Sequence, residues 1–389
     1  MSQVPIDLNA IHQRANALLQ AERWAEAETL LRQALASGTG PILLWRQLYA
    51  AFRQQGKYTE ATQVMEMVVQ TTPGDMGARF DLAELLLVQG EFTRGWREYR
   101  FRYKLDHTRG IERHVQQPRW EGQPIAGKTL LIHDEQGYGD TFQFLRLVAQ
   151  ARARSGAHVV LEVNQETYNL ARGIVGHDQL ITRGTLPPHF DFHCELMSLP
   201  AALGLQLSDL PGATPYLFAD ISRVEKWRAR LAGLPRPLVG LVWAGRPTHT
   251  NDKRRSLALA DLAPLAQEGI TFLALQKGPA SVQAATPPAG MSLLSLGDEI
   301  LDFDDTAAIL SLIDVMVSVD SSPVHLAGAL GCPAWVLLPF LPDWRWLLNR
   351  EDTPWYPSLR LFRQRESNQW AGVLQQVATE LAKLKEAGR

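Results

Sequence analysis

The chain has 389 residues and a formal net charge of −2 at pH 7, a balance that argues against a protein that coats nucleic acid. It has no apolar run long enough to span a membrane, and its N-terminus lacks the basic and hydrophobic segments of a signal peptide. Cys194 and Cys332 have no second Cys or His at metal-ligand spacing, so we expect buried thiols and no metal. A soluble, cytoplasmic protein is the expectation.

An interval of 34 residues separates Trp24 from Tyr58 and Tyr58 from Phe92. This interval is the period of tetratricopeptide repeats. A small residue follows each aromatic residue by three positions, which allows paired helices to approach closely; these residues are Ala27, Ala61 and Gly95. We therefore predict about three helix pairs over residues 1–110, which form either a purely structural array or a concave groove for a protein or peptide partner.

From about residue 120 onward, short apolar runs alternate with helical stretches. The runs are Thr129–His133, Ala157–Val163, Pro237–Trp243, Ile270–Gln276, Val315–Val319 and Ala334–Leu338. Continuous apolar runs separated by helices indicate parallel sheets that are buried on both faces. A stretch rich in Pro and Gly, Leu210–Pro215, divides the region, so we predict two Rossmann-like α/β domains facing a cleft, at 111–222 and 223–365. A C-terminal helix is expected at 366–389.

The first candidate site follows the run that ends at His133. Gly137 and Gly139 allow the backbone to approach a ligand, and Asp140 stands at the start of the next predicted helix. Asp140 either caps that helix or acts as a general base that accepts the proton of an attacking hydroxyl group. The spacing alone favours the cap.

The second candidate site follows the run that ends at Val319. Asp320-Ser321-Ser322 precedes a short helix, with Ser322 expected as its N-cap, Pro323 at its first position and Gly331 at its end. A helix N-terminus at the carboxyl end of a strand suits an anion such as a diphosphate. His325 lies in the first turn, either as a buried imidazole or as a donor to the ligand.

A cluster of cations follows the run that ends at Trp243. Lys253, Arg254 and Arg255 are consecutive in a polar loop that leaves the second predicted sheet. A solvated charge run is the default interpretation, but at least one cation could face the same phosphate as the Asp320 helix.

Together these residues resemble the heptosyltransferase-like glycosyltransferases of the GT-B fold. The resemblance rests on three segments, Gly137-Tyr-Gly-Asp140, Asn251-Asp-Lys-Arg254 and Asp320-Ser-Ser-x-x-His-x-Ala-x-Ala329, and the repeats extend it to bacterial repeat-containing glycosyltransferases, some of which modify proteins such as flagellin. It implies a nucleotide-diphosphate sugar as donor substrate and no cofactor. It places Asp140 as catalytic base, and puts Lys253, Arg254, Asp320, Ser321, Ser322 and His325 on the donor. Gly137, Gly139, Gln143, Trp243 and Trp344 are further candidates.

Two departures limit this resemblance. In that family the sequence before the nucleotide-binding helix is usually Asp-Thr-Gly, whereas here it is Asp320-Ser-Ser322. A serine in place of the glycine leaves less open space at the N-terminus of the helix. The chain also lacks the cysteines with which some bacterial protein heptosyltransferases bind a metal. We therefore expect an inverting, metal-independent enzyme, with homo-oligomerisation left open. The alternative is a non-catalytic repeat scaffold with a degenerate GT-B domain.

Two further features, one acidic and one aromatic, could have a structural role instead of a role in the site. Asp302-Phe-Asp304 matches the metal-binding Asp-x-Asp of other glycosyltransferases, but we expect a structural role, with Asp305 or Thr306 capping the next helix. Trp344 either packs against the C-terminal helix or flanks the donor base or sugar.

Overall fold

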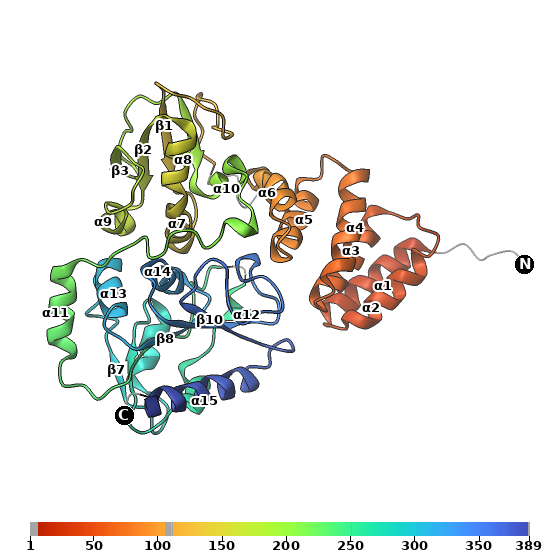
Figure 1. Ribbon diagram of the computed structural model, residues 1–389. Helices are drawn as coiled ribbons and strands as arrows, with labels where there is room; N and C mark the ends of the chain where they lie inside the picture. The colour runs from red at the N-terminus through yellow and green to blue at the C-terminus, as the bar shows by residue number, and fades with distance from the viewer. Residues whose placement is uncertain (1–6, 106–109, 111, 250, 388–389) are drawn as a thin grey trace, which may run out of the picture. The chain divides into compact units, whose positions relative to one another are not determined.

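A computed structural model of the protein describes residues 7–105, 110, 112–249 and 251–387. The first six residues, on which the expectation about a signal peptide falls, lie outside the described residues. The chain divides into two compact units (Figure 1). The repeat unit comprises the residues up to Glu112 together with Asp343–Leu348, and the α/β unit comprises Arg113–Pro342 and Asn349–Arg389.

The repeat unit consists of helix pairs, as the 34-residue period predicts. The pairs are α1 (Leu8–Gln20) with α2 (Trp24–Ala34), α3 (Ile42–Gln54) with α4 (Tyr58–Thr71), and α5 (Met76–Val88) with α6 (Phe92–Tyr99). Trp24, Tyr58 and Phe92 each begin the second helix of a pair. The prediction of tetratricopeptide repeats is therefore confirmed.

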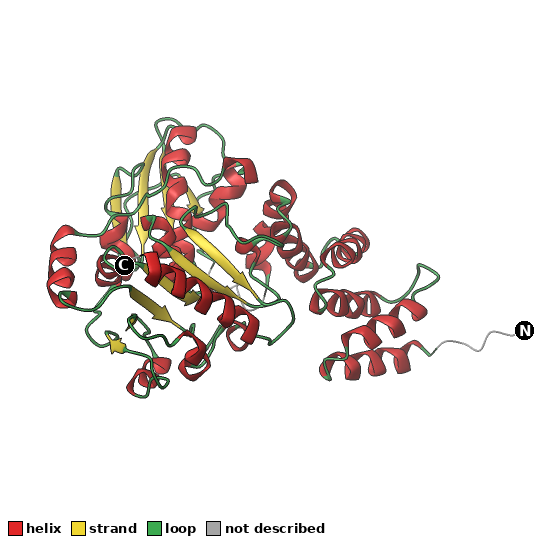
Figure 2. Ribbon diagram, turned by 60° about the horizontal axis from the view of Figure 1, so that its bottom comes forward, coloured by secondary structure: helices red, strands yellow, loops and turns green. Residues whose placement is uncertain are grey.

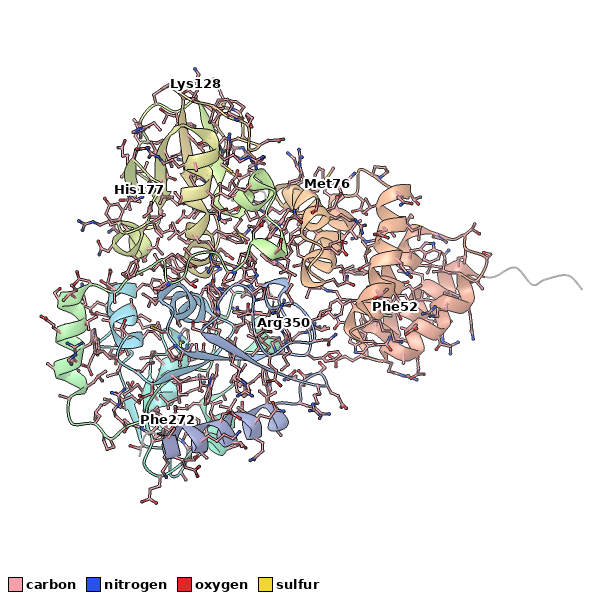
Figure 3. All side chains as sticks on the ribbon, in the orientation of Figure 1. Phe52, Met76, Lys128, His177, Phe272 and Arg350 are labelled. Atoms are coloured by element: carbon pink, nitrogen blue, oxygen red, sulfur yellow. The ribbon has the colours of Figure 1, made fainter. Side chains whose placement is uncertain are left out.

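Small residues bring the paired helices together. Ala27 and Ala61 are fully buried. A Cβ atom on Gly95 would lie 2.7 Å from the Leu87 side chain, so only glycine fits there. Phe52 of α3 lies in the core of the repeats (Figure 3). The contacts explain why the third position after each aromatic residue must be small.

The segment Asp343–Leu348 completes the aromatic core of the repeat unit. The Trp344 ring is 3% exposed and packs edge-on against Trp96, with 5.1 Å between ring centroids, and against Tyr99 at 6.0 Å. We had expected Trp344 either to pack against the C-terminal helix or to flank the donor base or sugar, and we did not predict its packing against the repeats. Its ring is enclosed by the aromatic residues of the third repeat.

The α/β unit contains two parallel sheets, each covered by helices (Figure 2). The first lobe has the strand order β3-β2-β1-β4. Its strands are β1 (Thr129–His133), β2 (His158–Val163), β3 (Gln179–Thr182) and β4 (Phe192–Glu195). Its helices are α7 (Tyr138–Phe144), α8 (Val148–Ser155), α9 (Tyr168–Ala171) and α10 (Leu199–Leu203).

The second lobe has the strand order β10-β9-β8-β5-β6-β7, all parallel. Its strands are β5 (Leu238–Val242), β6 (Thr271–Ala274), β7 (Leu293–Ser295), β8 (Val315–Val319), β9 (Ala334–Leu338) and β10 (Leu359–Arg363). Its helices are α12 (Asp252–Arg255), α13 (Phe303–Leu310), α14 (Ser322–Leu330) and α15 (Ala371–Ala387). Helix α11 (Ile221–Leu231) follows the Pro/Gly-rich divider and packs on α13. Phe272 of β6 is a fully buried member of this lobe's core.

The six predicted strands are the interior strands of the two sheets. The strands that the sequence did not reveal, β3, β4, β7 and β10, are the four edges. Interior strands are covered on both sides and read as continuous apolar runs, whereas edge strands carry polar residues. Among the described residues, no helix is long and apolar enough to cross a membrane.

Candidate functional site

Asp140 lies on α7, directly beyond the carboxyl end of β1. Gly137 is the N-cap residue, and the Asp140 carboxylate accepts a hydrogen bond from its backbone N–H at 2.9 Å. The capping role is therefore real, although Asp140 acts from the third helical position rather than as the N-cap itself. The side chain is partly exposed, so the carboxylate can also meet a substrate proton.

Beneath this loop, the carboxyl edge of the first sheet is unusually polar for a buried surface. His133, Asp134 and Glu195 are all at most 3% exposed. Burial lowers the pKa of His133 to about 4, despite the opposing charge of Glu195. Burial likewise raises the pKa of Asp134 to about 6, against the hydrogen bonds that it accepts from Asn164. We did not predict this layer from the sequence, because its members are far apart in the chain: His133 and Asp134 stand at the end of β1, and Glu195 at the end of β4.

Three residues of this layer, His133, His193 and Glu195, are the described set that could hold a metal ion, with ligand atoms within 4.8 Å of one another. Nitrogen and carboxylate ligands of this kind suit zinc. However, Arg119 donates to both oxygens of Glu195, at 2.8 and 2.9 Å, and His133 Nε2 lies 3.3 Å from His193 Nδ1. A guanidinium group on the carboxylate opposes a divalent cation, and the existing hydrogen bonds already hold the cluster together.

The donor-side candidates gather at the carboxyl end of β8. Ser321, one residue earlier than predicted, is the N-cap of α14, and its hydroxyl lies 3.1 Å from that of Ser318 rather than on a backbone amide. Gly331 ends the helix with a φ of 71°, as predicted. His325 is 5% exposed, and its Nε2 atom lies 3.7 Å from Asp320 Oδ1.

The cationic cluster divides between two roles. Arg255 Nη1 donates to the backbone oxygen of Asp320 at 2.8 Å, so this residue ties α12 to the end of β8. Lys253 and Arg254 are exposed, and neither pairs with a carboxylate in the described part of the chain. Arg255 belongs to the predicted cationic cluster, but we did not single it out as a site residue, since a run of three cations does not show which one turns inward.

The two candidate sites meet at Gly139. A Cβ atom built on Gly139 would lie 2.8 Å from His325 Cδ2 and 3.5 Å from the Cα atom of Ser322. Helices α7 and α14 are therefore in direct contact. The glycine is required for close approach of one helix to the other rather than for a positive φ.

Two further candidates are interior residues. Gln143 and Trp243 are both fully buried, and Trp243 belongs to the core of the second lobe. The backbone after Trp243 is held by Gln276, whose side chain accepts from the N–H groups of Trp243 and Ala244. Gln143 and Trp243 therefore support the ends of the strands from the interior of the protein.

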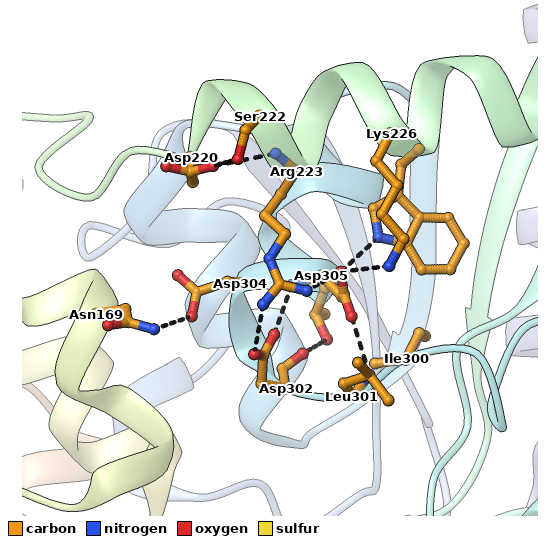
Figure 4. A network of polar contacts seen from close by, with 12 residues as sticks. Asn169, Asp220, Ser222, Arg223, Lys226, Ile300, Leu301, Asp302, Asp304 and Asp305 are labelled. Carbon is orange, nitrogen blue, oxygen red and sulfur yellow. Dashed lines mark hydrogen bonds and ion pairs between the residues drawn. The ribbon is translucent and has the colours of Figure 1, made fainter.

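The Asp-x-Asp segment forms a structural network (Figure 4). Asp302, not Asp305 or Thr306 as we expected, caps α13 by accepting from Asp305 N at 3.0 Å. Asp305 is fully buried and accepts from Arg223 at 2.9 Å and from Trp227 at 2.8 Å. Asp304 accepts from Asn169 on α9 at 3.0 Å, which joins the two lobes. The three aspartates thus already form hydrogen bonds or ion pairs with other residues of the protein.

A cavity of about 640 Å³ opens beside this network. Its lining comes from α9 and the residues after it, from the first turn of α11 and the segment before it, and from α13, and includes Asn169, Arg172, Asp220, Arg223 and Asp304. The lining contains neither Asp140 nor the N-terminal turn of α14. The cavity is therefore distinct from the meeting point at Gly139.

Comparisons with known proteins agree with this architecture. Residues 12–76 match the family model of the tetratricopeptide repeat. Protein FlbA of Caulobacter vibrioides is 24% identical over 444 residues, covering 97% of this chain and 73% of the relative.

Two solved structures resemble the α/β unit. Escherichia coli ADP-heptose lipopolysaccharide heptosyltransferase II is 16% identical with a TM-score of 0.50, and the match covers 67% of this chain and 99% of that one. A family 9 glycosyl transferase from Veillonella parvula is 10% identical over 69% of this chain and 100% of its own, with a TM-score of 0.47. The first of these establishes the fold. The protein therefore joins tetratricopeptide repeats to an α/β unit with the glycosyltransferase fold of the heptosyltransferases.

Proposed function

We propose that the protein transfers a sugar from a nucleotide-diphosphate sugar to a hydroxyl group of an acceptor. The observation that carries the proposal is the contact at Gly139, which brings the helix of Asp140 against the N-terminal turn of α14. A general base and an anion-binding helix terminus are the two groups that such a transfer requires. The heptosyltransferase fold supports the same reaction class.

In the proposed reaction, the Asp140 carboxylate accepts the proton of the acceptor hydroxyl. The oxygen attacks the anomeric carbon from the face opposite the diphosphate, so a new carbon–oxygen bond forms as the bond to the phosphate breaks and the configuration inverts. Lys253 and the N-terminal turn of α14 receive the departing diphosphate, and we propose Arg254, Asp320, Ser321 and Ser322 as further residues of the donor site. Cationic and dipolar groups can stabilise that charge, so the proposed reaction uses neither a metal nor another cofactor.

For the acceptor, we propose a protein or peptide in the cytoplasm, such as flagellin, bound by the repeats. Charged side chains on the first helices of neighbouring repeats are partly exposed: Arg53 pairs with Glu84 at 2.9 Å, and Arg46 lies 3.6 Å from Asp81. Repeats of this architecture commonly bind polypeptides. The charged side chains of these pairs can form ion pairs with charged groups of a bound polypeptide instead of with each other.

One observation favours the second candidate function, a non-catalytic scaffold. The Asp140 carboxylate already stabilises its own helix through Gly137, a structural use that requires no catalysis. In that case the protein would bind nucleotide sugars or protein partners without turnover.

A panel of nucleotide sugars separates the two functions. The purified protein is incubated with each sugar and candidate acceptor, with and without a chelator, and release of nucleoside diphosphate is measured together with labelling of the acceptor. We expect turnover with at least one donor, unaffected by the chelator. Binding of nucleotides without turnover would favour the scaffold, and turnover that the chelator abolishes would contradict the metal-independent reaction.

A further inference from the structure

The cavity beside the Asp-x-Asp segment is lined by residues of both lobes of the α/β unit. Its volume of about 640 Å³ falls within the range of roughly 300 to 1,000 Å³ that is usual for pockets that bind small organic ligands. Neither Asp140 nor Lys253 belongs to its lining, so the proposed transfer of a sugar does not use this cavity.

Asp304 presents a carboxylate oxygen to the cavity. The residue is 6% exposed, and its Oδ2 atom accepts from Asn169 Nδ2 at 3.0 Å (Figure 4). Its Oδ1 atom makes no hydrogen bond within the described part of the chain. Burial raises the pKa of Asp304, although the hydrogen bond from Asn169 opposes this shift. A buried carboxylate oxygen without a donor gains strongly from a hydroxyl group that a ligand brings.

Two further side chains of the lining offer acceptors. Asp220, the N-cap residue of α11, is exposed, and its hydrogen bonds from the Arg223 N–H and the Ser222 hydroxyl both fall on Oδ1. Its Oδ2 atom can accept from a ligand. Asn169 donates its amide nitrogen to Asp304, so its side-chain oxygen is also an acceptor. The cavity is therefore suited to a ligand with several hydrogen-bond donors.

The formal charges of the lining balance, because two guanidinium groups accompany the carboxylates of Asp220 and Asp304. Arg223 is paired with Asp305, at 2.9 Å, whereas Arg172 is exposed and pairs with no carboxylate among the described residues. A nucleotide phosphate would meet the carboxylates, and an amine would meet the guanidinium groups. The described groups that could hold a metal ion do not include these aspartates. A neutral ligand rich in hydroxyl groups fits this balance.

Phe218 adds a flat apolar surface to the polar lining. The residue is 65% exposed and lines the cavity. A single exposed apolar side chain needs no explanation by itself, but this one lies beside acceptors for hydroxyl groups. The C–H groups on one face of a sugar ring carry a small positive charge, which the negative face of an aromatic ring attracts. An aromatic face beside several acceptors matches the two kinds of surface that a sugar presents.

We propose that this cavity is a second carbohydrate site, for a neutral di- or trisaccharide whose hydroxyl groups donate to Asp304 and Asp220 while one sugar face packs on Phe218. Arg172 donates to hydroxyl oxygens of the same ligand. The proposal goes beyond the proposed function and does not depend on it. A protein that transfers no sugar would still bind the saccharide here.

The test begins with the labelled full-length protein on a glycan microarray. The free form of the neutral saccharide that binds best is then titrated by calorimetry into the wild type and the variants. Asp304→Asn keeps an oxygen for Asn169 but turns an N–H donor toward the ligand in place of an acceptor. Phe218→Ala removes the aromatic face. Its matched control is Ile221→Ala, which removes a 76% exposed apolar side chain outside the lining.

Asp304→Asn should weaken binding of the saccharide by about tenfold or more, as expected for a hydrogen bond to a charged group. Phe218→Ala should weaken it by about threefold to tenfold, while Ile221→Ala binds like the wild type. Circular dichroism checks that each variant is folded. If Asp304→Asn does not fold, Phe218→Ala carries the test, since its side chain is exposed.

Asp140→Asn and Lys253→Ala separate this site from the proposed donor and catalytic site. Both should bind the saccharide like the wild type, because neither residue lines the cavity. Loss of binding in either variant would place the saccharide elsewhere and overturn the proposal. Absence of any neutral saccharide that binds on the array would also overturn it, as would equal affinities in the wild type, Asp304→Asn and Phe218→Ala.

Discussion

At the scale of single residues, the neighbouring cations of the cluster Lys253–Arg255 have different roles. Arg255 is 13% exposed and supports the backbone at Asp320, whereas Lys253 is exposed and without a carboxylate partner in the described part of the chain. A flexible ammonium group of this kind is suited to a phosphate that arrives with the substrate. We therefore propose that Lys253 binds the donor phosphate.

Lys253→Ala should weaken binding of a nucleoside diphosphate by on the order of 30- to 150-fold, corresponding to roughly 2 to 3 kcal/mol for a charge-assisted contact. Calorimetry measures the affinity, with and without a chelator. Lys383→Ala, which removes an exposed lysine of α15, is the control. Unchanged affinity in Lys253→Ala, or loss of binding by the wild type in chelator, would exclude this assignment.

The buried carboxylate of Asp305 gives a prediction about stability. Burial alone would raise its pKa, but hydrogen bonds from Leu301 and Trp227 and the charges of Arg223 and Lys226 outweigh that effect, and the pKa lies below its ordinary value. A lowered pKa contributes stability above the unfolded-state pKa, near 4, and this contribution is lost as the pH falls through the folded-state value.

Asp305→Asn should therefore lower the free energy of unfolding by about 2 to 3 kcal/mol at neutral pH, because it leaves Arg223 without its buried partner. The difference from the wild type should shrink below about pH 4. Urea unfolding across this pH range measures both effects. Asp352→Asn breaks an exposed Arg–Asp pair and should change little; an equally small effect of Asp305→Asn would refute the argument.

At the scale of elements, the contact between α7 and α14 depends on Gly139. Gly139→Ala would place a methyl group 2.8 Å from the His325 ring, which is too close without a shift of one helix. Overpacking of this kind typically costs about 1 to 3 kcal/mol. We expect reduced turnover together with a lower melting temperature.

Gly372→Ala is the matched control for this substitution, because a Cβ atom there meets no atom within 4 Å. Thermal unfolding and donor turnover are measured for both variants. If Gly139→Ala matches the wild type in both, the two helices do not meet as closely as the structure indicates.

The helices and strands also differ in how well the sequence alone predicts them. The repeat period and the interior strands were predictable, since burial on both faces requires continuous apolar runs. The edge strands, such as β4 and β10, were not, because His193, Arg360 and similar residues break the apolar pattern. The inward turn of Arg255 and the polar layer around His133 depend on tertiary contacts, which local sequence does not encode.

At the scale of the whole molecule, the repeats and the α/β unit should contribute separately to the reaction. If the repeats bind the acceptor, they raise its local concentration for the enzyme without touching the donor. Deleting residues 1 to 75 removes α1 to α4 and leaves α5 and α6 with Trp344. Nucleotide binding should persist while transfer to a protein acceptor collapses.

Circular dichroism must first establish that the truncated protein is folded, because the deletion exposes the apolar face of the third repeat. Calorimetry with nucleotide and transfer to the acceptor are then compared with the full-length protein. Transfer at the full-length rate would show that the repeats do not select the acceptor, and would favour a role in oligomerisation or localisation.

The role of Asp140 as the base in sugar transfer can be tested by measuring turnover and donor affinity side by side in Asp140→Asn. The amide keeps an oxygen for the Gly137 N–H but cannot accept the substrate proton. Asp261→Asn, which alters an exposed carboxylate with the same capping geometry, is the matched control. We predict that Asp140→Asn loses about 100-fold or more in kcat with nearly unchanged donor Kd, while Asp261→Asn retains both. Wild-type turnover in Asp140→Asn would show that Asp140 is not the base and would leave it as a helix cap.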